Sequence, residues 1–127
     1  KILARPDAPE FRCVIDEAVL LRLAALPELA RDQFRHLVDI AEAVNTVTLQ
    51  VLPIGVGLHG CMHGSTVILD YADDRDPSIV YLETRGHGTY LETPGQVADY
   101  RRALDDVTAD ALSKAASVEL MKRMITN

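Results

Sequence analysis

The side chains best suited to chemistry lie in one glycine-rich loop, residues 53–64. His59, Cys61 and His63 fall within five residues of one another there. Imidazole and thiolate groups are good ligands for divalent transition metals, and the alternate spacing can bring two of them to one ion. A structural zinc site takes four ligands, however, and His87 is the only other nearby candidate. We therefore treat the three residues as weak metal candidates and expect no metal or cofactor.

The same loop also suggests a cysteine nucleophile paired with a histidine base. Cys61 lies beside Gly60 in an accessible segment, but the sequence identifies no third group that would orient the histidine. The chain is therefore predicted not to be an enzyme and to have no catalytic residues. A small metal- or thiol-dependent hydrolase that uses His59, Cys61 and His63 is the alternative.

Carboxylates offer a further option, acid–base chemistry by two of the following: Asp16, Glu17, Glu83 and Glu92. Local roles are simpler. Asp16 stands where an N-cap is expected, and Glu17 follows near the positive end of the helix. Glu83 and Glu92 end strands beside a loop at residues 85–88, where we expect an ion pair with Arg85 or Arg101.

Aromatic and charged residues gather around these loops. If the chain binds a small molecule, we expect six residues to form the pocket: His59, Tyr81, Glu83, Arg85, Tyr90 and Glu92. The glycines of residues 53–64 match neither the P-loop nor the dinucleotide fingerprint. They are expected to permit positive φ angles or a mobile lid rather than to bind phosphate.

The elements that must position these residues follow from hydrophobic periodicity and from turn and cap residues. Pro27 suits the first turn of a helix whose apolar residues recur at three-and-four spacing. Val47, Leu49 and Val51 alternate with polar residues, as in a half-buried strand. The expected strands are residues 11–15, 46–52, 65–71, 78–84 and 89–92, and the expected helices are 17–25, 27–44, 94–112 and 114–125.

Successive strands with short connections favour an antiparallel sheet with helices packed on one face. We therefore predict an α+β fold with an antiparallel sheet of about four strands, in the order β-α-α-β-β-β-(β)-α-α. Thr93 and Ser113 are expected to cap the last two helices. Met121 and Met124 are expected on the buried side of the final helix, or alternatively at a dimer interface.

Length and charge bound the function. The chain has 127 residues, 48% of them hydrophobic, and a formal net charge of -6. A duplex-binding domain normally carries a basic excess, so direct binding to DNA or to an anionic membrane surface is disfavoured. Only two cysteines occur, and no apolar run is long enough to cross a bilayer. These features favour a cytoplasmic protein with no membrane contact.

Several segments, taken in order, carry a family resemblance: residues 14–20, 33–41 and 47–53, the glycine-rich loop with His59, and residues 79–83, 90–92 and 100–112 with Ser117. Together they resemble the domain of unknown function that follows the helix-turn-helix in actinobacterial, antitoxin-like transcriptional regulators of the xenobiotic-response-element (Cro/repressor-like) class. The resemblance implies an upstream DNA-binding domain of about 70 to 80 residues and a small partner protein encoded nearby. The family has no settled ligand and no accepted catalytic residues, so the resemblance assigns no active-site residues to this chain.

The start of the chain is consistent with that resemblance. The chain does not begin with methionine, and residues 1–10 hold Pro6 and Pro9, as is typical of a linker. We expect residues 1–10 to connect a missing N-terminal DNA-binding domain to a regulatory or interaction domain at residues 11–127. That domain is expected to sense an effector, bind a partner or mediate homodimerisation. An oligomerisation module without a ligand is a further alternative.

Overall fold

The computed structural model describes residues 5–62, 64–73 and 75–126. The chain divides into two compact units. Unit 1 consists of Lys1–Val56 and Asp110–Asn127, and unit 2 consists of Gly57–Ala109. Unit 2 is therefore an insertion in the sequence of unit 1, between a strand and the last helix.

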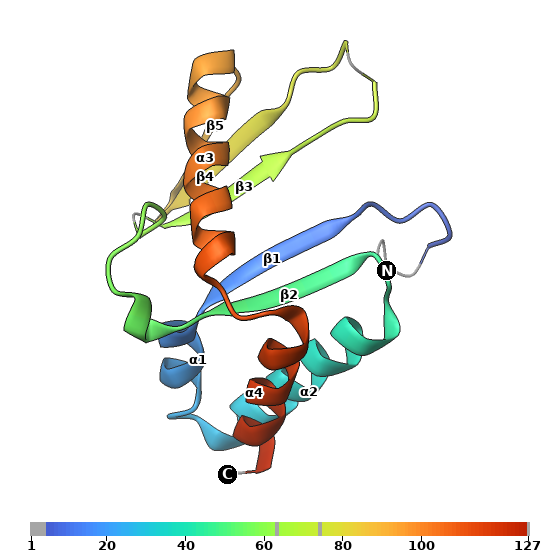
Figure 1. Ribbon diagram of the computed structural model, residues 1–127, viewed down its shortest axis with the longest axis vertical. Helices are drawn as coiled ribbons and strands as arrows, with labels where there is room; N and C mark the ends of the chain where they lie inside the picture. Colours follow the sequence, from blue (N-terminus) through green and yellow to red (C-terminus); the bar gives the residue numbers. More distant parts are fainter. Residues whose placement is uncertain (1–4, 63, 74, 127) are drawn as a thin grey trace. The chain divides into compact units, whose positions relative to one another are not determined.

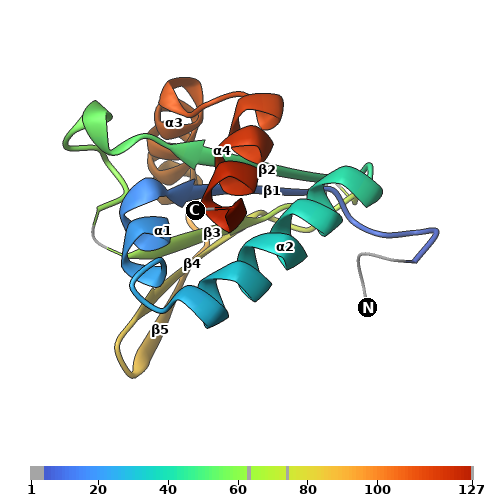
Figure 2. The ribbon, with the colours of Figure 1, turned by 90° about the horizontal axis from the view of Figure 1, so that it is seen from below.

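Unit 1 contains a two-stranded parallel sheet with helices on one face (Figures 1 and 2). Its elements are β1 (Phe11–Asp16), α1 (Glu17–Leu23), α2 (Pro27–Ala43), β2 (Val47–Leu52), a short 3-10 helix η2 (Ile54–Val56) and α4 (Lys114–Thr126). Asp16 caps α1, since its Oδ1 accepts a hydrogen bond from the Ala18 N–H at 3.0 Å. Pro27 begins α2, as predicted, because its fixed φ suits a first helical turn.

The core of unit 1 lies between β2 and the helices. Val47, Leu49 and Val51 alternate along β2 and are buried, which confirms the predicted half-buried strand. They pack in one cluster with Phe34 of α2 and Met121 of α4, both fully buried. Burial of each such side chain contributes about 1.5–3 kcal/mol, so this cluster is the main source of stability in unit 1.

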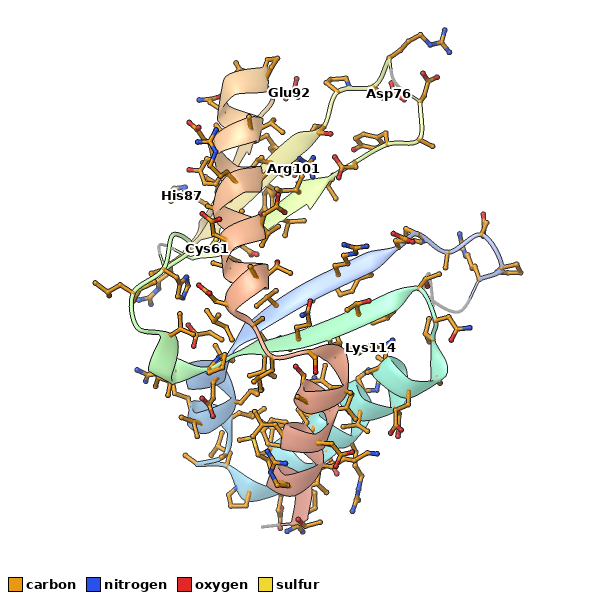
Figure 3. The ribbon with its side chains drawn as sticks, in the orientation of Figure 1. Cys61, Asp76, His87, Glu92, Arg101 and Lys114 are labelled. Atoms are coloured by element: carbon orange, nitrogen blue, oxygen red, sulfur yellow. The ribbon has the colours of Figure 1, made fainter. Side chains whose placement is uncertain are left out.

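The second edge of β2 is occupied by the segment that leads into α4. Leu112 donates its N–H to the Val51 carbonyl at 2.8 Å, and the Ser117 Oγ accepts from the Val51 N–H at 2.9 Å. The Nζ of Lys114 donates to the Val47 carbonyl at 3.1 Å (Figure 3). These hydrogen bonds occupy backbone groups of β2 with which a further strand would otherwise pair.

The α+β class is confirmed, but the prediction of a single antiparallel sheet of about four strands is wrong. β1 pairs with β2 in parallel, from Phe11↔Val47 to Asp16↔Leu52. The two intervening helices provide the long crossover that a parallel pair requires. The strands of unit 2 form a separate sheet, and the second edge of β2 is already occupied by Leu112. The short helix η2 is an element that the predicted order lacked.

Unit 2 is a three-stranded antiparallel sheet with one long helix. Its elements are β3 (Ser65–Leu69), β4 (Ile79–Thr84), β5 (His87–Leu91) and α3 (Pro94–Asp110), whose last residue belongs to unit 1. β4 lies in the centre, and Arg85 and Gly86 alone form the turn to β5. Gly86 has φ +79°, a conformation that favours glycine, which fits a type II turn.

The two faces of this sheet differ. α3 crosses one face, where Val80 is fully buried (Figures 1 and 2). The opposite face carries Val67 and Leu69 of β3 and Tyr90 of β5, which are 43%, 41% and 65% exposed. We call this second face, made by Val67, Leu69, Ile79, Tyr81, Glu83, Gly88 and Tyr90, the free face. The pleat sets this division, because successive side chains point to opposite sides of a strand.

The predicted caps of the last two helices can be compared directly. Ser113 caps α4, since its Oγ accepts from the Ala116 N–H at 3.1 Å. At the start of α3 the Thr93 hydroxyl instead donates to the Gln96 Oε1 at 2.7 Å. Both helices begin next to the predicted cap, so local chemistry decided these boundaries.

Candidate functional site

Two of the six predicted pocket residues form a ring contact on the free face. Tyr81 and Tyr90 are opposite each other in the β4–β5 register, with ring centroids 4.8 Å apart and planes tilted by 42°. Directly opposite residues alternate between hydrogen-bonded and non-bonded pairs, and the pair next to a two-residue turn is bonded. Thr84↔His87 is the pair next to the turn, so Tyr81↔Tyr90, three pairs further along, is a non-hydrogen-bonded pair. In such pairs the side chains approach each other most closely.

Gly88 makes room for this arrangement. A Cβ built at Gly88 would lie 2.5 Å from the Tyr81 Oη and 2.6 Å from its Cε1. The phenol of Tyr81 therefore lies directly over Gly88 on the free face. Gly88 was not predicted to have this role, although a glycine inside a strand is a recognised sign of a close approach.

Glu83 shares the free face with the two tyrosines. It lies two residues from Tyr81 on β4, opposite Gly88, and it is exposed. Arg85 is exposed in the turn, and Glu92 is exposed just after β5 ends. Tyr81, Glu83 and Tyr90 are thus brought onto one face, with Arg85 and Glu92 at opposite ends of β5.

The separation of Glu83 and Glu92 bears on acid–base chemistry. Glu83 is level with Gly88, and Glu92 lies four residues further along. At about 3.3 Å per residue the two backbone positions are about 13 Å apart along the strand. In Figure 3, His87 at the start of β5 and Glu92 just beyond its end lie well apart. A carboxylate pair acting on one bond needs a closer approach, so this arrangement counts against the pair.

The two other candidate carboxylates have local roles. Asp16 caps α1, and the Glu17 Oε1 accepts from the Ile54 N–H at 2.9 Å. The second bond fixes η2 against the start of α1 within unit 1. These contacts support the predicted structural interpretation of both residues.

His59 lies elsewhere in unit 2. Its Nδ1 accepts a hydrogen bond from the Cys61 N–H at 3.2 Å, which organises the loop locally. A Cβ at the adjacent Gly60 would lie 3.2 Å from the Cβ of Ala103 on α3. The loop therefore lies beside α3, whereas Tyr81 and Tyr90 lie on the face of the sheet away from that helix.

The metal and thiol interpretations of this loop gain no support from the described residues. No group of three His, Cys, Asp or Glu side chains in that part of the chain is placed to hold a metal ion. His63 lies outside the described residues. Burial raises the pKa of the Cys61 thiol, and it does the same for Cys13 in unit 1. A raised thiol pKa lowers the thiolate fraction at neutral pH, which disfavours a cysteine nucleophile.

The prediction that Arg101 pairs with Glu83 or Glu92 was wrong. Its guanidinium binds Asp70 through two bonds, Nη2–Oδ1 at 2.6 Å and Nη1–Oδ2 at 3.2 Å (Figure 3). Asp70 follows β3 and also accepts a short hydrogen bond from the Ser78 hydroxyl. The hydrogen bonds from Arg101 and Ser78 lower the pKa of Asp70, and the bond to Asp70 raises that of Arg101. This pair joins α3 to the sheet.

The charge of the chain is concentrated in unit 2. Residues 57–109 contain nine Asp and Glu residues against four Arg and no Lys, so they carry -5 of the formal net charge of -6. The free face therefore belongs to a strongly acidic unit. Electrostatic complementarity favours cationic partners for such a surface and disfavours nucleic acid.

No helix among the described residues combines the length and apolar character needed to cross a membrane.

Comparison with known proteins identifies the family. No curated protein and no solved structure matches the chain. The model of the family described as a domain of unknown function, DUF5753, matches residues 1–123, which is nearly the whole sequence. The chain therefore belongs to the DUF5753 family of domains of unknown function.

Proposed function

We propose that this chain is the non-enzymatic regulatory domain of a helix-turn-helix transcriptional regulator and that unit 2 provides its binding surface. The observation that carries the proposal is the free face, where half-buried Tyr81 contacts exposed Tyr90 beside a carboxylate, on a small inserted unit. Solvent-exposed aromatic residues on a sheet are typical of recognition surfaces. The partner is a protein or a small effector, and DNA is bound by an upstream domain.

The charge distribution supports the assignment of partner binding to unit 2 and of DNA binding to an upstream domain. Unit 2 is strongly acidic, so neither its free face nor its helix offers the basic patch that neutralises phosphates. In the proposed protein the operator is contacted by the helix-turn-helix domain alone. Repressors of this kind usually read two half-sites, so we expect the intact protein to be a homodimer.

The connection between the units supports a regulatory role. Two chain crossings join unit 2 to unit 1, and both are bonded within unit 1 near the end of β2. Ile54 donates its N–H to Glu17 on one crossing, and Leu112 donates to Val51 on the other. A ligand on unit 2 would act on unit 1 through these fixed crossings. Coupling then requires that the ligand bind more tightly to one arrangement of the DNA-binding domains than to another.

The first test is the gene-encoded sequence upstream of Lys1. A helix-turn-helix of suitable length there supports the proposal. An open reading frame that begins within a few residues of Lys1 contradicts it, because no DNA-binding half would then exist.

The second test uses the full-length protein and DNA from upstream of its own gene in a mobility-shift assay. Tyr90→Ala should leave operator affinity unchanged and alter the response to the partner encoded beside the gene. Leu58→Ala, which removes an exposed apolar side chain from the loop, is the matched control. If the two variants respond identically, the free face is not the regulatory surface.

Two measurements separate the remaining alternatives. A hydrolase that uses the loop would lose all turnover in Cys61→Ala, whereas a regulatory domain would keep its partner binding. An oligomerisation module without a ligand would change size with concentration and show no thermal stabilisation in a ligand screen, since a ligand that binds the folded state raises the melting temperature.

A further inference from the structure

The outer edge of β5 is exposed. β5 is an edge strand of the unit 2 sheet and pairs with β4 on its other side. Thr89 and Tyr90 are successive residues that point to opposite faces, and both are exposed. Among the described residues, therefore, neither face of the strand is covered at this point, although α3 lies on one side of the sheet.

The backbone groups at this edge can be assigned from the turn. Because Arg85 and Gly86 alone connect β4 to β5, the residues of β5 that bond to β4 are His87, Thr89 and Leu91. The N–H and C=O groups of Gly88 and Tyr90 consequently point outward. An edge with free donors and acceptors at alternate residues is a template for another strand.

β5 lacks several of the features that protect an edge strand. The strand contains no proline and no lysine. Its register with β4 is continuous from Val80↔Leu91 to Thr84↔His87, so no bulge twists the edge away. Native proteins commonly protect exposed edges with these features. Their absence here is consistent with an edge that is used for binding.

Charge identifies the kind of segment that fits. Unit 2 carries a net charge of -5. At β5 itself the exposed ring of Tyr90 lies near Glu92 at one end of the strand, and Arg85 stands in the turn at the other end. An arginine or lysine on an incoming strand can stack on the Tyr90 ring while its charge meets the acidic surface. A second copy of the chain would bring another acidic unit to the same edge, which charge repulsion disfavours.

We propose that β5 binds an extended, positively charged segment of a partner protein, which adds to the sheet as a fourth strand. Main-chain hydrogen bonds to Gly88 and Tyr90 provide affinity, and basic side chains opposite Tyr90 and Glu92 provide specificity. The inference rests on the proposed function, because it names the class of partner and the surface that the regulatory domain uses.

The test uses a short acetylated and amidated peptide of alternating threonine and arginine, with a threonine–glutamate peptide as the control. Binding is measured by calorimetry and by amide hydrogen exchange in the full-length protein. The arginine peptide should bind, more weakly as salt increases, and should slow exchange at Gly88 and Tyr90. Thr89 and Leu91, which already bond to β4, should change little.

Two variants separate the side chain from the backbone. Tyr90→Ala removes the ring and should weaken binding about three- to fivefold. Tyr90→Pro also removes the outward N–H without removing a bond to β4, and it should weaken binding by about a further tenfold. If Tyr90→Pro does not fold, exchange in the unaltered protein still decides the question.

Three results would overturn the inference: no binding of the arginine peptide, equal binding of the glutamate peptide, or saturation without protection of Gly88 and Tyr90. These results are distinguishable from failure of the proposed function. A full-length protein that binds its operator and responds to a partner, yet fails the peptide test, loses only the β5 inference. A protein without a DNA-binding domain that passes the test keeps the β5 site and loses the regulator function.

Discussion

The phenol ring of Tyr81 lies over Gly88 so closely that a methyl group at residue 88 would be 2.5 Å from its hydroxyl oxygen. Gly88 is thus the residue that allows the Tyr81–Tyr90 contact on the free face. Because the clash involves the end of a side chain, a larger residue at this position would displace the ring rather than the backbone.

Gly88→Ala should therefore swing the Tyr81 ring away and lower the free energy of unfolding by about 0.5–1.5 kcal/mol, the value of an aromatic pair. Chemical denaturation measures the change. In a Tyr81→Ala background the same substitution should cost nothing or stabilise, since alanine restricts the unfolded chain more than glycine does. Gly95→Ala, where an added Cβ has no atom within 4 Å, is the control. Equal effects at residues 88 and 95 would contradict the interpretation.

Gly86 tests the turn rather than the packing. Its φ is +79° and an added Cβ would have no atom within 4 Å, so only backbone conformation opposes a side chain there. Gly86→Ala should cost about 1–2 kcal/mol, and Gly86→Asn should cost less because asparagine tolerates this conformation. Thermal or chemical unfolding compares the two variants. If they are equally stable, the left-handed turn does not limit stability.

Ser117 is a fully buried polar residue whose hydroxyl accepts from the Val51 N–H. Ser117→Ala leaves that donor without its acceptor and should lower the free energy of unfolding by about 1–3 kcal/mol. Ser65→Ala, at an exposed position on β3, should change it by less than about 0.5 kcal/mol. A loss at residue 117 no larger than that at residue 65 would show that the Ser117 hydroxyl does not anchor α4 to β2.

The Asp70–Arg101 pair predicts a dependence of stability on pH. The pKa of Asp70 is lowered in the folded state, so its contribution is present above the ordinary Asp pKa and is lost as pH falls through the lowered value. The side chains are 56% and 41% exposed, so solvent screening limits the effect to less than about 1 kcal/mol.

Asp70→Asn should accordingly reduce the loss of stability between neutral and strongly acidic pH. Urea unfolding of both proteins across this range measures the difference, which high salt should diminish. Identical pH profiles for the two proteins would show that the pair contributes nothing to folding.

The Cys61 thiol should react slowly at neutral pH. Burial raises its pKa, so the thiolate, which is the reactive form, is scarce until the pH is well into the alkaline range. Iodoacetamide labelling of Cys13→Ser as a function of pH isolates this thiol. Labelling faster than that of free cysteine at neutral pH would support the alternative hypothesis that Cys61 is a nucleophile.

Local chemistry in the sequence was sufficient to predict several features. Asp16 accepts a hydrogen bond two residues away, Ser113 accepts one three residues away, and Pro27 begins a helix through its own fixed φ. The alternation along β2 likewise requires only the pleat of a strand. These signals depend on neighbours in the sequence, so no tertiary information was needed to find them.

Tertiary structure alone decided how distant segments pair. The parallel register of β1 with β2 joins residues separated by two helices, and Leu112 reaches the edge of β2 from far along the chain. Arg101 binds Asp70, 31 residues away, rather than the nearer carboxylates that we expected. Periodicity predicts which side of a strand is buried, but it does not predict the partner of a strand edge or of a charged group. Those depend on the whole chain, because several partners were chemically equivalent and only folding brought one of them close.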